Sequence, residues 1–224
     1  MRPVYSPISV PTEPTKANRW FVFSPKLRRM AAFHNQLNFE RWLLLESDPD
    51  VEQFCEFPAD ATAWINRRFY RVRIHLWIRY RDGSNVFENL SYKEVNPRRP
   101  SPEQRACQDW AERQAGRHVT LTQAEVRTSR LLLENLERIL GHYNQADYAR
   151  SLDKAISAKP EIIEAIKRAP GISVGVLLRA IAKRWCIEPT RYAVFDLILG
   201  GQVEAGLSRR LFDSSTRVNL TKTT

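Results

Sequence analysis

Residues 92–97, Tyr-Lys-Glu-Val-Asn-Pro, close a stretch whose alternating pattern predicts two hairpin strands, and they place Glu94 two residues before Asn96. Side chains two apart on a strand point to the same face. A strand that ends in Glu-x-Lys can therefore present a carboxylate to a divalent metal and a cation to the attacked phosphate. Here Asn96 stands where the lysine would be. The pattern indicates a site for phosphodiester cleavage in which the lysine is replaced by asparagine.

The charge of the chain favours a partner that carries phosphates. Its 224 residues include 35 Lys and Arg against 25 Asp and Glu, a formal net charge of +10. The alternative is that the protein is basic without having a partner that carries phosphates. The three cysteines have no pairing or zinc-binding spacing, which indicates a reducing compartment. No apolar run is long enough to span a membrane, so we expect a cytoplasmic protein without a membrane partner.

Hydrophobic periodicity predicts an extended proline-rich arm over residues 1–19, an α/β domain over 20–124 and a helical domain over 125–224. In the α/β domain, strands are predicted at 20–26, 51–57, 61–65, 69–80, 86–95 and 118–121, and the fifth of them contains a bulge or wide loop at 88–90. Two helices are predicted in the same domain. The first covers 37–45, and the second begins at a cap at Ser101 and ends at Gly116. In the helical domain, a capping box at Thr122 predicts the start of the first helix. Further helices are predicted at 152–166, 174–185 and 191–199, with breaks at Pro160, Pro170-Gly171 and Pro189. Two short strands at 202–205 and 216–220 are predicted to form a wing.

The order of several motifs resembles that of a known family. They are Ser24–Arg29, Leu44–Val51, Glu56–Pro58, Arg79–Gly83, Glu94–Pro97, Thr122–Arg127 and Leu132–Leu136. Over residues 24–220 the chain is similar to TnsA, the endonuclease subunit of heteromeric TnsA/TnsB transposases. The resemblance implies a restriction-endonuclease-like N-terminal domain and a winged-helix-like C-terminal domain.

In active members of that family a helix Glu, a strand Asp, a Glu or Gln, and a Lys converge on divalent metal. The resemblance maps these positions onto Asn38, His75, Glu94 and Asn96, so only Glu94 could ligate metal. Since Mg²⁺ prefers anionic oxygens and Asn96 carries no positive charge, this set predicts a degenerate site. No cofactor is expected, or Mg²⁺ if the site is active.

Three rearrangements could in principle restore the missing groups of that site. Glu40 lies two residues after Asn38, about 200° around a helix, so it cannot simply replace it. A register with Lys93 as the cation has Ser91 two residues before it and also lacks a carboxylate. Movement of Glu40 or Glu88 into the site stays open.

Two groups of basic residues are candidate binding surfaces. For DNA, the prediction names Arg71, Arg73, Arg98 and Arg99, with a solvated hairpin face as the alternative for the first two. In the helical domain it names Arg179, Lys183, Arg184 and Arg191. These could contact DNA, but the resemblance implies contact with an AAA+ regulator.

The resulting hypothesis is a TnsA-like subunit of a DNA transposition complex. It would bind double-stranded transposon-end DNA and bridge a TnsB-like DDE transposase to a TnsC-like AAA+ ATPase without cutting. One alternative is an active metal-dependent endonuclease that cuts the 5′, non-transferred strand at transposon ends. Another is a DNA-binding regulator outside transposition.

Overall fold

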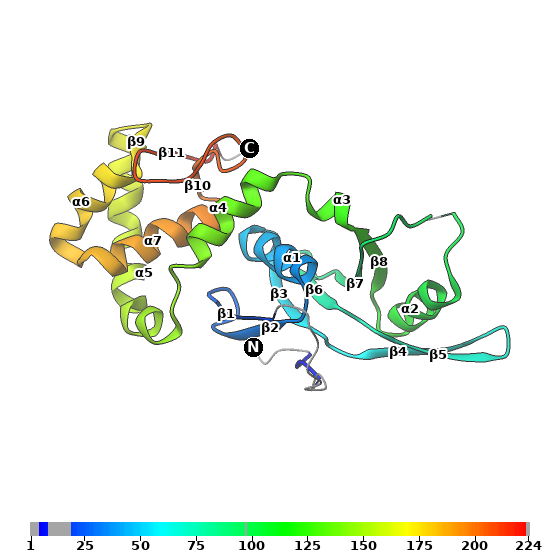
Figure 1. Cartoon of the computed structure of the whole chain (residues 1–224). Helices are drawn as coiled ribbons and strands as arrows, with labels where there is room; N and C mark the ends of the chain where they lie inside the picture. Colours follow the sequence, from blue (N-terminus) through cyan, green and yellow to red (C-terminus); the bar gives the residue numbers. More distant parts are fainter. Residues whose placement is uncertain (1–4, 9–18, 97, 223–224) are drawn as a thin grey trace. The chain divides into compact units, whose positions relative to one another are not determined.

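The structure is a computed structural model that describes residues 5–8, 19–96 and 98–222. Most of the predicted N-terminal arm lies outside these residues. Within the part of the arm that is described, the Tyr5 ring packs against the rings of Trp77 and Phe87, with centroid distances of 5.0 and 5.7 Å. The chain is mixed α/β, as predicted (Figure 1).

Two compact units make up the chain. Unit 1 consists of Met1–Val22, Ala31–Trp42 and Asp50–Thr128, and unit 2 of Phe23–Met30, Leu43–Pro49 and Ser129–Thr224. Two short segments from the first fifty residues therefore pack with the helical unit. In unit 2, Ser24 donates a hydrogen bond to the Glu46 carboxylate, and the Lys26 ammonium donates to the Leu45 and Asp48 carbonyl oxygens at 2.7 and 2.6 Å.

A four-stranded sheet in the order β3-β6-β7-β8 forms the centre of unit 1. The first three strands are antiparallel, whereas β8 runs parallel to β7 because helix α2 makes the crossover between them. A buried cluster that includes Trp77, Phe87 and Ala111 joins the sheet to α2. The elements before and within this core are β1 (Trp20–Ser24), β2 (Arg29–Phe33), α1 (Gln36–Ser47), β3 (Val51–Glu56), β6 (Leu76–Tyr80), β7 (Asn85–Ser91), α2 (Pro102–Arg113) and β8 (Arg117–Thr122).

The single strand predicted over residues 69–80 is wrong. It is two strands, β5 (Arg68–Arg73) and β6, which belong to different sheets because the chain leaves its ladder at Ile74 and His75. β5 pairs with β4 (Asp60–Ile65) in a two-stranded ribbon, while β6 pairs with β3 and β7. Uniform alternation does not reveal such a change of partner.

The strand predicted to run to Val95 also ends earlier. β7 stops at Ser91, whose hydroxyl bonds with the backbone of Lys93 and turns the chain. The predicted bulge at residues 88–90 is absent from this described strand, which pairs regularly with β8. The irregularity lies in β3 instead, between Val51 and Gln53.

Helices dominate unit 2. The capping box at Thr122 is confirmed, but its helix, α3 (Gln123–Val126), is one turn long and belongs to unit 1. A new helix starts at Ser129, whose hydroxyl caps it. Neither Pro160 nor Pro189 ends a helix, because the long helix α5 continues past the first and α7 holds the second in its first turn. The helices are α4 (Arg130–Leu140), α5 (Gln145–Arg168), α6 (Val174–Trp185) and α7 (Ile187–Leu199).

The two predicted C-terminal strands are present and pair with each other. β11 (Arg217–Leu220) is central in a three-stranded sheet, between β10 (Val203–Glu204) and β9 (Ile172–Ser173). Because β9 directly precedes α6, this small sheet ties the start of that helix to the C-terminal strands.

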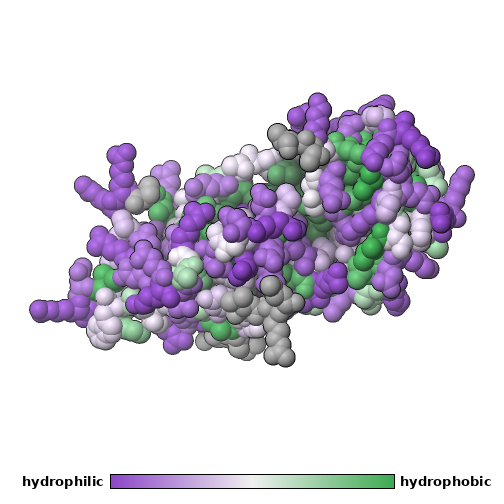
Figure 2. Space-filling view, turned by 180° about the vertical axis from the view of Figure 1, so that it is seen from behind, coloured by the Kyte–Doolittle hydropathy of each residue, from purple (hydrophilic) through white to green (hydrophobic). Residues whose placement is uncertain are grey.

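Hydrophilic residues cover most of the face in Figure 2, with hydrophobic residues in separate patches. Across the ranges that the structure describes, none of the helices combines the length and the apolar character that crossing a bilayer requires.

Asn135 supports a prediction about unit 2. Its side chain is buried, donates to the carbonyl oxygens of Leu207 and Arg210 at 2.7 and 2.8 Å, and accepts from the Phe212 amide at 2.7 Å. Asn135→Ala leaves three backbone groups without this partner, so we expect the unfolding free energy to fall by about 3 kcal/mol in urea denaturation. The control is Glu134→Ala at the exposed neighbouring position. Equal effects of the two variants would contradict this role of Asn135.

Candidate functional site

Helix α1 and strand β7 meet at a buried polar cluster in unit 1. Asn38 and Arg41 are three residues apart on α1 and therefore share one face of the helix. Asn38 is only 2% exposed. Among the described residues, its side-chain oxygen finds no hydrogen-bond donor. The helix position expected to carry a metal-binding carboxylate thus holds a buried neutral amide.

Arg41 forms a two-pronged ion pair with Glu88 of β7. Its Nε donates to Oε2 and its Nη2 to Oε1 of that carboxylate, both at 2.8 Å. The two side chains are 13% and 4% exposed. Burial alone would lower the pKa of Arg41, but hydrogen bonding to Glu88 and its negative charge raise the pKa overall. The guanidinium therefore stays charged and occupies both oxygens of the carboxylate.

His75 lies next to Glu88, where the chain enters β6. Its backbone amide donates to the Glu88 carbonyl oxygen at 3.1 Å, and its Nδ1 accepts from the Leu90 amide at 2.9 Å. A ring nitrogen that accepts an N–H bond carries no proton. Burial, and then the positive charge of Arg73, lower the pKa of His75 to about 4. The imidazole is therefore neutral at physiological pH.

A second polar chain extends from this point to β8. Asn89 donates to the Arg73 carbonyl oxygen at 2.7 Å, and its own oxygen lies 3.0 Å from His118 Nε2. Since the amide oxygen only accepts, we assign the proton to Nε2 of His118. Burial, and then His75, lower the pKa of His118 to about 4. Both histidines thus act as neutral hydrogen-bonding groups.

Glu40 is engaged elsewhere and does not replace a missing ligand. One of its oxygens accepts from Arg127 Nε at 2.6 Å, and the other accepts from Gln36 at 3.1 Å. This pairing holds α1 to the chain just after α3. Of the two carboxylates considered as substitutes, only Glu88 therefore lies at the cluster, and it is bound by Arg41.

Of the four mapped positions, Asn38 shares a face of α1 with Arg41, and His75 bonds through its backbone amide to Glu88, the partner of Arg41. Glu94 and Asn96 lie beyond the end of β7 and are exposed, with Asn96 turning the chain by accepting from the Arg98 amide at 2.9 Å. Glu88 was predicted only as a possible replacement ligand, and Arg41 and His118 were not predicted as site residues. The available signal was the helical spacing of Asn38 and Arg41, but the pairing of Arg41 with a strand 47 residues away has no local signature.

The donor set does not fit Mg²⁺. This ion requires hard, anionic oxygen ligands in near-octahedral order. Here both Glu88 oxygens accept from Arg41, and Nδ1 of His75 accepts from a backbone amide. In the described part of the chain, no group of three or more His, Cys, Asp or Glu side chains is placed to hold a metal ion.

The predicted DNA-binding arginines fall on two different elements. Arg71 and Arg73 lie on β5 and share the carboxylate of Asp60, with Arg71 Nη2 at 2.6 Å. Hydrogen bonding from Arg73 chiefly lowers the pKa of Asp60. Arg98 and Arg99 are exposed in the loop before α2. One carboxylate thus offsets two arginines, and the loop adds two further positive charges.

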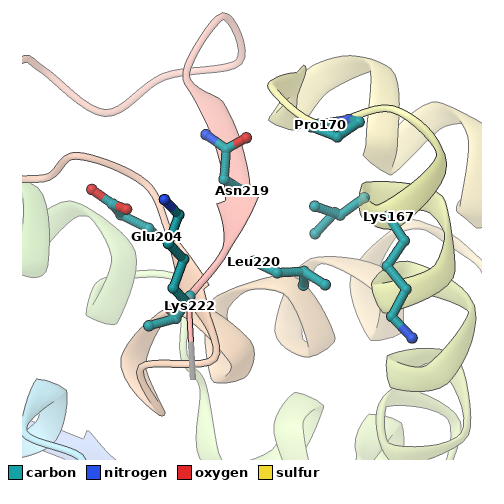
Figure 3. A pocket seen from close by; sticks show the side chains of 8 residues that line it. Lys167, Pro170, Glu204, Asn219, Leu220 and Lys222 are labelled. Atoms are coloured by element: carbon teal, nitrogen blue, oxygen red, sulfur yellow. The ribbon is translucent and has the colours of Figure 1, made fainter. Parts of the chain in front are cut away.

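The predicted partner-binding residues lie on two helices of unit 2. Arg179 and Lys183 are exposed on α6, and Arg184 lies over the Trp185 ring at 5.1 Å. Arg191 of α7 bonds to Glu188 at 2.8 Å. An open pocket of about 610 Å³ in the same unit is lined by Lys167 near the end of α5, by Pro170, and by Asn219 and Leu220 of β11 (Figure 3).

Breaking the buried ion pair should be strongly destabilising. Arg41→Met leaves a buried unpaired carboxylate, so we expect the unfolding free energy to fall by about 3–5 kcal/mol. The double variant Arg41→Met/Glu88→Leu should recover most of this loss, which urea denaturation measures. Arg138→Ala breaks an exposed helical pair with Glu134 and should cost less than about 1 kcal/mol. If Arg41→Met lowered the unfolding free energy by no more than Arg138→Ala does, the buried pair would be contradicted.

The two histidines predict a fall in stability between about pH 6.5 and pH 4. Because their pKa values are about 4 in the folded protein and 6.5 when unconstrained, the unfolded chain binds more protons in this range. Each histidine should lower the unfolding free energy by up to about 2 kcal/mol between pH 7 and pH 5. Thermal melting at both pH values measures this loss. His75→Gln/His118→Gln should flatten the dependence, and an unchanged slope would refute the assignment.

No protein-family model matches the chain, and no curated protein sequence matches it.

Proposed function

We propose that this chain is a TnsA-like subunit of a DNA transposition complex that binds transposon-end DNA without cutting it. The observation that carries the proposal is the buried Arg41–Glu88 pair, in which a side chain supplies the positive charge that a nuclease of this kind takes from its metal. Asn38 and His75, at two further mapped positions, supply no anionic ligand. We propose that Glu88, rather than Glu94, takes the third position of the site.

The fold of unit 1 supports the restriction-endonuclease-like part of this proposal. Helix α1 precedes three antiparallel strands, and α2 then returns the chain to a fourth, parallel strand. In the family, the first helix and neighbouring strands converge on the site of cleavage. In this chain the corresponding meeting point is the cluster of Arg41, His75 and Glu88.

Unit 2 supports the partner-binding part. Helices α6 and α7 followed by the paired strands β10 and β11 are compatible with a winged-helix-like domain. We propose that its exposed cations, led by Arg179 and Lys183, contact an AAA+ ATPase of the TnsC type, while the chain also associates with a TnsB-like DDE transposase. Without second-strand cutting, the non-transferred strand stays attached to the donor, and joining is replicative.

Reconstitution tests this function. The purified protein, with such a transposase, the ATPase and transposon-end duplex in Mg²⁺ or Mn²⁺, should join the complex and leave the 5′ strand uncut. The physical reason is that Glu88 is neutralised by Arg41, so no open carboxylate site receives the ion. Strand cutting is read on denaturing gels and association by pull-down.

Each outcome separates one hypothesis from another. Metal-dependent nicking that disappears with Glu88→Gln, in a variant shown to be folded, would establish the active endonuclease instead. DNA binding without association with either protein would favour a regulator outside transposition. Arg179→Glu/Lys183→Glu should weaken ATPase capture, whereas Glu134→Ala, also in unit 2, should not change it.

A further inference from the structure

The ribbon of β4 and β5 carries an exposed face with two kinds of residue. Its register pairs Asp60 with Arg73, Thr62 with Arg71 and Trp64 with Phe69, and alternate pairs of a ribbon share one face. This face, which we call the arm face, therefore has arginines near its base and two aromatic rings near its tip. Trp64 and Phe69 are 71% and 51% exposed, and their rings contact each other at 5.5 Å.

The opposite face of the ribbon is already occupied. Ala61 and Ala63 are buried, and Ala61 belongs to the cluster that includes Cys107 and Ala111 of α2. Arg113 of α2 also donates to the Thr62 carbonyl oxygen at 2.7 Å. The helix therefore supports the base of the ribbon as far as Ala63. In Figure 1 the paired strands extend beyond α2.

The turn at the tip places a cation in an unfavourable backbone conformation. Ile65 pairs with Arg68, so Asn66 and Arg67 form a two-residue loop, with φ values of 50° and 63°. Such hairpin loops need positive φ at both positions and favour Asn followed by Gly. Arginine in place of glycine is strained, and strain of this kind clusters at functional sites. In the described chain, neither Arg67 nor Arg68 forms an ion pair with a carboxylate.

We propose that the β4–β5 ribbon is a DNA-binding arm whose tip enters the minor groove of duplex DNA, with Trp64 and Phe69 wedged at a base step and Arg67 and Arg68 beside the phosphates. This deepens the proposed function and rests on it. Along the whole ribbon, four arginines accompany a single aspartate, and this positive charge complements phosphate. The unsupported part, about three residues per strand, extends about 10 Å, which matches a groove about 7.5 Å deep.

Fluorescence anisotropy with a labelled 30-base-pair duplex tests the arm, with 2-aminopurine at internal steps to detect unstacking. Trp64→Ala/Phe69→Ala should weaken binding by about tenfold or more and abolish the 2-aminopurine signal. The matched control is Phe21→Ala/Met30→Ala, which removes exposed apolar side chains from the β1–β2 hairpin. That control should bind and unstack as the wild type does.

Arg67→Gly separates DNA contact from folding. Glycine relieves the positive φ, so the melting temperature should stay the same or rise, while DNA binding weakens and the salt slope of log affinity falls by about 0.9. The arm proposal is overturned if both ribbon variants bind and unstack DNA like the wild type, even if Trp64→Ala/Phe69→Ala loses capture of a protein partner. Absence of DNA binding by the wild type would overturn the proposed function as well. Arm-dependent binding without any association with the transposase or ATPase would remove only the transposition role.

Discussion

The ion pair between Arg41 and Glu88 is the interaction on which the polar centre of unit 1 depends. It joins the middle of α1 to the middle of β7, and removing either partner would leave the other buried without its counter-charge. The same two groups decide the chemistry, because a carboxylate held on both oxygens by a guanidinium is not available to a metal ion. Structure and the proposed loss of cleavage thus have one physical origin.

The break at Ile74 and His75 determines what surrounds this centre. Before it, the chain forms a ribbon that α2 supports on one face only, and after it the chain enters the main sheet. His75 itself is held at the junction by the Leu90 amide and the Glu88 carbonyl oxygen. A single change of strand partner therefore produces both a closed polar cluster and an exposed arm within unit 1.

Unit 2 depends on residues that precede most of unit 1 in the sequence. Phe23 packs its ring on Tyr148, and Pro49 lies against Gly201, whose positive φ also favours glycine. Tyr143 and Tyr148 both donate to the Asp196 carboxylate, and burial raises the pKa of each phenol. A C-terminal segment beginning at residue 125 would lack Phe23 and Pro49. The two-domain division at residue 124 remains a prediction.

Local features were determined by the sequence alone. The mixed α/β class, the caps at Ser101 and Thr122 and the paired C-terminal strands follow from periodicity and from residues within four positions of one another. Tertiary structure decided where β5 becomes β6, where β7 ends and which carboxylate meets α1. Sequence mapping named Asn38, His75 and Glu94, but it did not predict the contact between Arg41 and Glu88. The physical reason is that strand pairing and burial join residues such as Arg41 and Glu88, far apart in the chain, and no local pattern records their contact.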